Sequence, residues 1–286
     1  MLPSQPKTSA RHSAWPAGFL VRHVALPSDH GSWIFLITPL LIGLALGGLR
    51  PASLLLIAAL LAAFLLRQPV TLAVKVYAGR RPKRVLPAVL FWSGVYSLAG
   101  LAAFAGLVTL GDGYLAWLLL PALPVFAWYL VLVGRRDERR QMLLEILASG
   151  VLALAAPAAF WVGQGRVSNM GWLLWGLAWL QVSGSILYAY LRLAQRVLNQ
   201  PPSWHQTWAM SRLALFANLA LFLLSLGLAS GHITPRWLPI AFLIQPLEVL
   251  WGMTHPAVGA KPTAIGIRQL IISLAFTLAF ILAWSL

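Results

Sequence analysis

The chain contains no cysteine and very few acidic residues. Of its 286 residues, 9% are charged and only six are Asp or Glu, while 60% are hydrophobic. The absence of cysteine excludes disulfides, thiol catalysis and cysteine-ligated metal. The shortage of charge excludes an ordinary soluble domain, in which about a quarter of the residues are charged. A chain this apolar needs lipid as the solvent for much of its surface.

Sequence motifs for metal and phosphate binding are also missing. No two histidines stand at ligand spacing within one apolar run, so a His-Glu-x-x-His zinc site is excluded, and there is no Walker-type phosphate loop. We therefore predict no cofactor. The net charge of +15 could indicate a nucleic-acid partner. However, the basic residues sit in short connections between apolar runs, where membrane topology explains them, so we predict none.

Long apolar runs fill the chain from residue 33 onward. A spanning helix needs roughly 20 mostly apolar residues. Nine runs qualify: 33–49, 52–66, 85–110, 114–133, 142–162, 168–191, 209–229, 237–253 and 265–286. We predict an all-α polytopic membrane protein with about nine transmembrane helices over 33–286. Residues 1–32 would form a basic tail without a signal-peptide core, in which Trp15 and 19–21 could make a short interfacial helix.

The basic residues divide unequally between the two sides of this arrangement. Eighteen lie in the tail and around the connections after spans 2, 4, 6 and 8, whereas Arg50, Arg166 and Arg236 lie on the other side. Cytoplasmic loops carry the excess of Lys and Arg. We therefore predict a cytoplasmic N-terminus and a C-terminus outside.

Asp29 and His30 are the first candidate site, because an acid and a histidine stand together at the mouth of the first span. Ionisable groups near the membrane are the default functional candidates. In one interpretation Asp29 caps the helix and meets the positive end of its dipole. In the other, both residues face a cytoplasmic opening, where they bind a ligand or relay protons.

Glu145 and Glu248 are the next candidates. Glu145 lies one turn inside the fifth span and either pairs with Gln141 or a neighbouring arginine, or binds a ligand. Glu248 is the deepest acid, so it must be protonated or have a basic partner. A structural pair and a site both stay open. If the protein is an enzyme, His30 or Glu248 would be the catalytic acid or base.

Cations near the cytoplasmic side are candidate ligands for an anionic head group. Tyr188, Arg192 and Arg196 follow one another at four-residue spacing, which places them on one helix face. Lys75 and Arg80 belong to a connection that contains no acid. Paired arginines suit an anionic group, although snorkelling to lipid phosphates is the alternative.

Three short motifs resemble the YwiC-like family of bacterial integral membrane proteins. The entry Pro27-Ser-Asp-His-Gly-Ser-Trp33, followed by Pro39 and Gly43, looks like that family's Pro-x-acid-His-Gly-x-Trp opening. The stretch 139–145 looks like its charged start to a middle helix, and 187–192 looks like its Tyr-x-Arg helix end. The resemblance implies a multi-pass protein of the bacterial inner membrane.

Nine helices in this orientation also look like the UbiA-type intramembrane prenyltransferases. In those enzymes, Asp-rich motifs after helices 2 and 6 hold Mg²⁺ on a prenyl diphosphate. The corresponding connections here, 67–84 and 192–208, contain no Asp or Glu, and Mg²⁺ requires oxygen ligands. The resemblance therefore implies a UbiA-like bundle without the metal-assisted reaction.

Three functions follow as hypotheses. The first is binding of an isoprenoid, quinone or other lipid-like molecule with an anionic head in a cytoplasm-facing cavity. The second is a divergent prenyl- or lipid-transferring enzyme. The third is a small transporter, or an accessory subunit with a protein partner in a larger membrane complex. Broken helices near the membrane midplane would favour the transporter, and Pro121, Pro124 and Pro157 are places for such a break.

Overall fold

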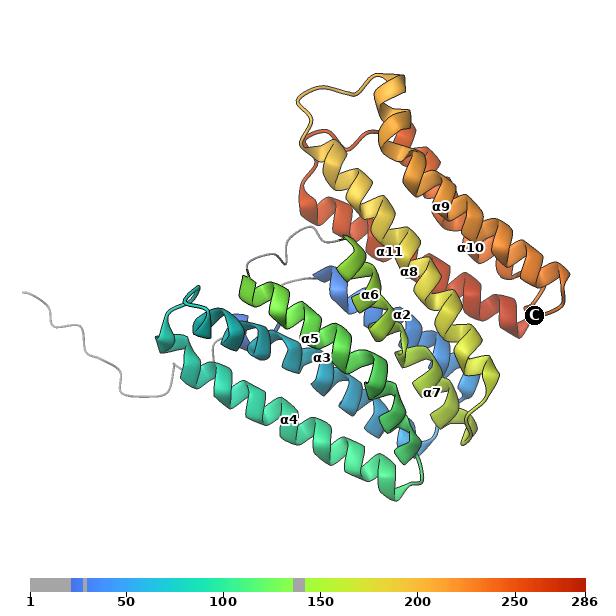
Figure 1. The fold of residues 1–286 in the computed structure, drawn as a ribbon. Helices are drawn as coiled ribbons and strands as arrows, with labels where there is room; N and C mark the ends of the chain where they lie inside the picture. Colours follow the sequence, from blue (N-terminus) through green and yellow to red (C-terminus); the bar gives the residue numbers. More distant parts are fainter. Residues whose placement is uncertain (1–21, 28–29, 136–141) are drawn as a thin grey trace, which may run out of the picture.

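The computed structural model describes residues 22–27, 30–135 and 142–286, and the regular elements of this part are helices (Figure 1). Each expected span corresponds to one helix or to two consecutive helices. In order they are α2 (His30–Gly47), α3 (Pro51–Tyr77), α4 (Leu86–Thr109), η2 (Gly113–Leu118) with α5 (Leu119–Arg135), α6 (Met142–Ala153) with α7 (Ala155–Gln164), α8 (Asn169–Arg196), α9 (Trp204–Ser230), α10 (Leu238–Thr254) and α11 (Pro262–Ser285). Two short helices, α1 (Arg22–Ala25) and η1 (Lys83–Val85), precede α2 and α4. The prediction of an all-α fold is confirmed.

The helices have the length and composition of membrane spans. Among the described residues, seven helical stretches are long and apolar enough to cross a membrane, and α2 and α10 are shorter apolar helices. The chain is therefore a multi-pass membrane protein. Trp15 and 19–21, where an interfacial helix was expected, lie outside the described residues.

Two elements differ from the expected spans. Helix α3 does not end near residue 66 but continues to Tyr77, because Leu72 and Val76 on its extension are buried and Arg67 is a good helix former. The expected span 142–162 is interrupted at Leu154, whose amide bonds to the carbonyl of Val151. Pro157 follows three residues later, and proline removes a donor from the helical ladder.

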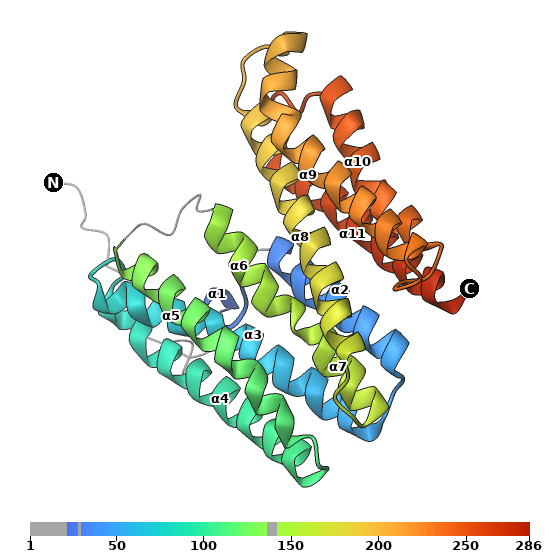
Figure 2. The ribbon, with the colours of Figure 1, turned by 45° about the vertical axis from the view of Figure 1, so that its right-hand side comes forward.

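The helices form two groups with a centre between them. Helices α3, α4 and α5 lie side by side on one flank, and α8 to α11 form the other (Figures 1 and 2). Helices α2, α6 and α7 lie between the groups, and every residue of Ala155–Val162 in α7 is buried. The core is therefore built around α7.

Helix α2 reaches α7 through glycines. A Cβ atom on Gly47 would lie 2.7 Å from Cα of Phe160, and one on Gly163 would lie 2.5 Å from the carbonyl carbon of Gly47. Gly43 stands equally close to the carbonyl of Ala156. Small residues allow helix backbones to touch in membranes, so these positions set the separation of α2 and α7.

The outer helices of the first group bury little of their surface. Within the most apolar part of each span, 11% of the η1–α4 stretch and 6% of the η2–α5 stretch are buried, whereas 61% of the α6–α7 stretch is buried. Their exposed residues are apolar, as expected for surface that faces lipid. We call the end of the bundle where α3, α5, α8 and α10 terminate the basic end; Arg50, Arg166 and Arg236 lie toward the opposite end.

Candidate functional site: a buried ionic cluster and an apolar groove

Helix α8 carries a buried polar stripe. Gln181, Ser185, Tyr188, Arg192 and Gln195 are all at most 7% exposed. Their spacing alternates between four and three residues, which keeps them on one helix face. Helix α8 therefore buries a row of polar side chains beside apolar ones such as Leu191, which packs against α9 and α10.

Glu248 of α10 is the centre of the cluster that meets this stripe. The hydroxyl of Tyr188 donates to Oε1 of Glu248 at 2.8 Å. Arg268 of α11 donates through Nε to Oε1 and through Nη2 to Oε2, the latter at 2.7 Å. The carboxylate is 5% exposed. Three helices are thus joined at one bidentate ion pair, a geometry that is strong as well as specific.

The depth of Glu248 in the membrane explains why it has a basic partner. Glu248 and Arg268 each stand six residues from the basic end of their helices, which is about 9 Å at 1.5 Å per residue. The hydrocarbon core is roughly 30 Å thick, so the pair lies within the half nearer the basic end. Arg268 is the basic partner that the depth of Glu248 demands.

Arg192 caps the C-terminus of α10 with hydrogen bonds. Its Nη1 donates to the carbonyls of Gly252 and His255, at 3.1 and 2.7 Å, and to Oε1 of Gln195 at 2.9 Å. The amide of Ala257 also donates to Gln195. Carbonyls at a helix C-terminus lack partners within the helix, so Arg192 and Gln195 supply what α10 and the loop after it require.

Trp251 brings both arginines together. The guanidinium carbon of Arg268 lies 3.3 Å from the centre of the indole ring, and that of Arg192 lies 5.3 Å from it. The ring of His255 stacks on Trp251 at 4.7 Å. Cation–π contacts stabilise an arginine without adding charge, so Trp251 offsets part of the cost of placing two guanidinium groups near each other.

The described residues around the expected opening site are bonded to helices of the first group. Ser32 accepts a hydrogen bond from Arg67 at 3.1 Å, and Tyr96 donates to the carbonyl of Ala25 at 2.9 Å. Arg67 stands ten residues from the basic end of α3, or about 15 Å. His30 begins α2 at this level. Its side chain and the whole of Asp29 lie outside the described residues.

The other expected site residues occupy separate helix ends. Arg80 donates to the carbonyl of Val133 at the end of α5, and Arg196 donates through Nε to the carbonyl of Ala260. Glu145 is exposed in the first turn of α6, and Lys75 is partly buried in the last turn of α3. Of the expected set, the structure brings Tyr188, Arg192 and Glu248 together, with Arg196 one turn farther along α8.

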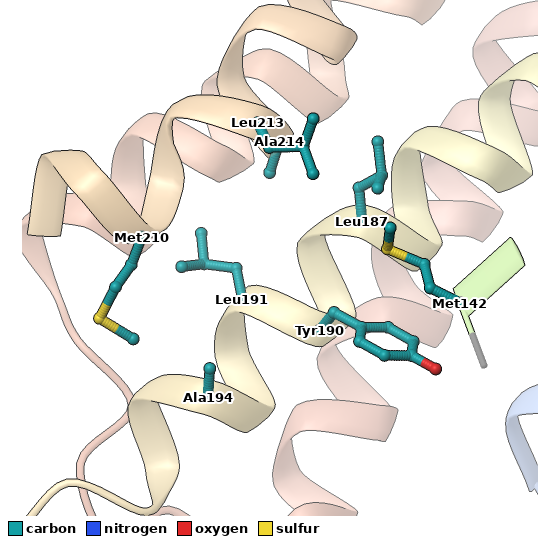
Figure 3. A pocket seen from close by; sticks show the side chains of 8 residues that line it. All are labelled: Met142, Leu187, Tyr190, Leu191, Ala194, Met210, Leu213 and Ala214. Carbon is teal, nitrogen blue, oxygen red and sulfur yellow. The ribbon is translucent and has the colours of Figure 1, made fainter. Parts of the chain in front are cut away.

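An apolar groove opens on another face of α8. It has a volume of about 280 Å³ and lies between α6, α8 and α9 near the basic end (Figure 3). Leu187, Tyr190 and Leu191 project into it from α8, and Met142 and Met210 border it. A larger groove of about 510 Å³ lies between α2 and α11 toward the opposite end, and includes Leu44 and Leu278. Both are lined mainly by apolar side chains, as lipid-tail sites would be.

Comparison with known proteins gives two matches. The family model described as YwiC-like protein matches residues 26–160. The resemblance to the YwiC-like family is confirmed. The uncharacterized protein YwiC of Bacillus subtilis (strain 168) is 27% identical over 199 residues, which is 69% of this chain and 77% of that protein. No solved structure matches the chain, and the UbiA-like arrangement stays a prediction.

The YwiC-like match covers one half of the molecule better than the other. It begins at the opening segment and ends at Phe160 in α7, so the ionic cluster lies beyond it.

Among the described residues, no group of three His, Asp or Glu side chains is arranged to hold a metal ion. The contacts that the structure shows in the cluster are ion pairing, hydrogen bonding and cation–π stacking.

Sequence reasoning missed Arg268 and Trp251 as members of the cluster. Arg268 was only one of the eighteen basic residues that indicate the membrane topology, although it stands near the start of the last span. An acid at membrane depth requires a cation of the same depth, and Arg268 satisfies that condition from the sequence alone. Trp251 gives no comparable signal, because it is one of 14 tryptophans.

Proposed function

We propose that this YwiC-like protein binds a lipid-like molecule with an anionic head, such as an isoprenoid or a quinone-type lipid, at its basic end. The apolar groove between α6, α8 and α9 would take part of the tail. The observation that carries the proposal is this groove, which opens near the end of the bundle that carries most of the cations.

The dimensions and setting of the groove support this assignment. Ligand pockets measure roughly 300 to 1,000 Å³, so about 280 Å³ suits a section of a chain rather than a whole lipid. Arg196 stands in the last turn of α8, at the same end of the bundle as the groove, and engages the carbonyl of Ala260 through Nε.

The native ligand is tested by mass spectrometry of protein purified gently from its own membrane. We expect a stoichiometric lipid-like species in the wild type and its loss in Ala194→Phe, because the new ring would fill the groove. Ala105→Phe on the exposed face of α4 is the matched control and should retain the species. Equal retention in both variants would remove the groove from the proposal.

The orientation that the proposal needs is an N-terminus in the cytoplasm, in the inner membrane of a bacterium. The chain has no cysteine, so single-cysteine variants report topology directly. Lys83 and Ser230 are exposed at opposite ends of the bundle. Ser230→Cys should react with a membrane-impermeant maleimide on spheroplasts, and Lys83→Cys only after permeabilisation. The reverse pattern would place the groove in the outer leaflet.

A small transporter is the second candidate, and the interruption at Leu154 favours it. The break falls near the middle of the α6–α7 span, where transporters unwind helices around their substrates. A Leu154→Cys variant should then react with a small water-soluble thiol reagent, since thiolates form only where water enters. Leu98→Cys, on the exposed face of α4, is the control. Complete protection of Cys at 154 would argue against a transport path there.

A further inference from the structure

The connection between α3 and α4 carries a run of exposed cations, Arg81, Lys83 and Arg84, which we call the basic patch. Within the part of the chain that the structure describes, none of the three makes an ion pair or a side-chain hydrogen bond. The stretch 67–84 contains no Asp or Glu. Like charges placed this close together repel one another, so the basic patch requires an anion from elsewhere.

The arginines at the same end of the second helix group are already engaged. Arg268 pairs with Glu248, and Arg192 and Arg196 donate to backbone carbonyls. The α3–α4 connection lies at a corner of the bundle, on the flank opposite α8 to α11 (Figures 1 and 2). The basic patch therefore differs from these arginines, because its charge is available to a partner outside the chain.

Hydrogen bonds hold the backbone of this connection. The amide of Arg80 donates to the carbonyl of Lys75 at 2.8 Å, and the amide of Gly79 donates to that of Val76 at 3.0 Å. Gly79 has a φ of +69°, so α3 ends in a Schellman motif, which favours glycine at this place. The side chain of Arg80 donates to the carbonyl of Val133 and ties the connection to α5. Because the backbone is held, a ligand would have less of it to order on binding.

Exposed apolar side chains adjoin the basic patch at the start of α4. Leu90 and Phe91 are 57% and 44% exposed, and they stand about 10 Å along the chain from Arg84. Tyr77 at the end of α3 is 75% exposed, as tyrosines at the membrane–water interface are. Cations above an apolar face suit a phospholipid, which has a charged head above its acyl chains. A nucleic acid would contact the cations alone.

We propose that the basic patch binds the head group of an anionic phospholipid, whose acyl chains lie on the exposed face of α4. The N–H groups of Arg81 and Arg84 match the oxygens of a phosphate, and Lys83 adds a point charge. A zwitterionic phospholipid should bind less well, because its own amine cancels the charge of its phosphate. The basic patch lies on the first helix group and does not depend on the ligand proposed for the apolar groove between α6, α8 and α9.

The test is native mass spectrometry of the full chain with equal concentrations of phosphatidylglycerol and phosphatidylcholine that carry the same acyl chains. The measured quantity is the ratio of the two lipid adducts, and we expect the wild type to prefer phosphatidylglycerol. A cation near the surface contributes about fivefold to the binding of an anionic head group. Arg81→Gln with Arg84→Gln should therefore lower the ratio roughly 25-fold. This variant should fold, since both side chains are exposed.

A matched control separates a local site from net charge. Arg212→Gln with Lys261→Gln also removes two exposed cations from the half of the bundle nearer the basic end, but on the second helix group, and it should keep the wild-type ratio. Ala194→Phe should keep it as well, so a failure of the groove and a failure of the basic patch give different results. Equal ratios in the wild type and the patch variant would overturn the proposal. An equal fall in the patch and control variants would also overturn it and assign the preference to net charge.

Discussion

Between α2 and α7 the helix backbones touch, whereas among α8, α10 and α11 polar and charged side chains fill the space between helices. The first contact rests on Gly43, Gly47 and Gly163, at which even a Cβ atom would collide with backbone. The second rests on the ion pair between Glu248 of α10 and Arg268 of α11. One chain therefore uses two opposite ways of joining helices.

The difference follows from the solvent. Lipid tails are as apolar as leucine, so burying apolar surface between helices drives association only weakly. Close backbone packing and polar contacts remain. A contact of the first kind is broken by adding atoms, and one of the second kind by removing a charge.

Removing the carboxylate of the ionic cluster should have the largest effect. Glu248→Leu leaves Arg268 without its acceptor and Tyr188 without its partner. We expect a loss of about 2.5 kcal/mol in the free energy of unfolding, less than for a fully buried pair, because the side chain of Arg268 is 38% exposed and water can solvate its charge. Unfolding in detergent, followed by circular dichroism against a denaturant, measures it.

The double variant tests whether that loss comes from the pair. Glu248→Leu with Arg268→Leu removes both charges, and a hydrophobic replacement of a buried pair is often neutral or stabilising. We expect it to be more stable than Glu248→Leu alone. If the loss in the double variant equals the sum of the losses in Glu248→Leu and in Arg268→Leu, the two side chains are not coupled and the cluster does not join α10 to α11.

Adding one methyl group should damage the other contact. Gly43→Ala places a Cβ against the carbonyl of Ala156, which is backbone and cannot turn away. Overpacking of this kind costs about 2 kcal/mol. Gly176→Ala in α8 is the matched control, because its Cβ meets open space and alanine is the better helix former. A harmless Gly43→Ala would mean that α2 and α7 are not held this closely.

The apolar spans within the described residues and their order could be predicted from the sequence because length, hydropathy and charge asymmetry are local properties. The extension of α3 to Tyr77 could not, since it depends on the burial of Leu72 and Val76. For the interruption at Leu154 the sequence offered Pro157 as one place for a break but did not fix its position. Gly43 was visible as part of the opening motif. Its role against Ala156 became evident only when α7 was placed beside α2.

The candidate site was predictable to the extent that charge in a membrane demands a partner. Glu248 was identified for this reason, whereas Tyr188 and Arg192 were identified because their spacing places them on one helix face, and the three do lie together. Their grouping with Arg268 and Trp251 depends on the relative rotation of three helices, which periodicity does not give. The groove was missed entirely, because leucine and methionine at helical spacing look the same in a core and in a lipid site.

Removing one hydrogen bond from the cluster should have an intermediate effect. Tyr188→Phe keeps the buried ring and its contact with Arg192 but loses the donor to Glu248. We expect a loss of about 1 kcal/mol, because Arg268 continues to satisfy the carboxylate. Denaturant unfolding beside Glu248→Leu measures the ratio. A loss as large as that of Glu248→Leu would make the tyrosine, and not the arginine, the main partner of the carboxylate.

The smallest effect is expected on the flank that belongs to neither contact. Leu98 of α4 is 71% exposed, so Leu98→Ala should change the free energy of unfolding by no more than about 0.5 kcal/mol. The same variant, purified with its membrane lipids, should keep the oligomeric state of the wild type on size-exclusion chromatography. If it instead dissociates a complex, then α4 packs against another protein rather than lipid. The flank would then be a third helix contact, and the accessory-subunit hypothesis would gain over the ligand-binding one.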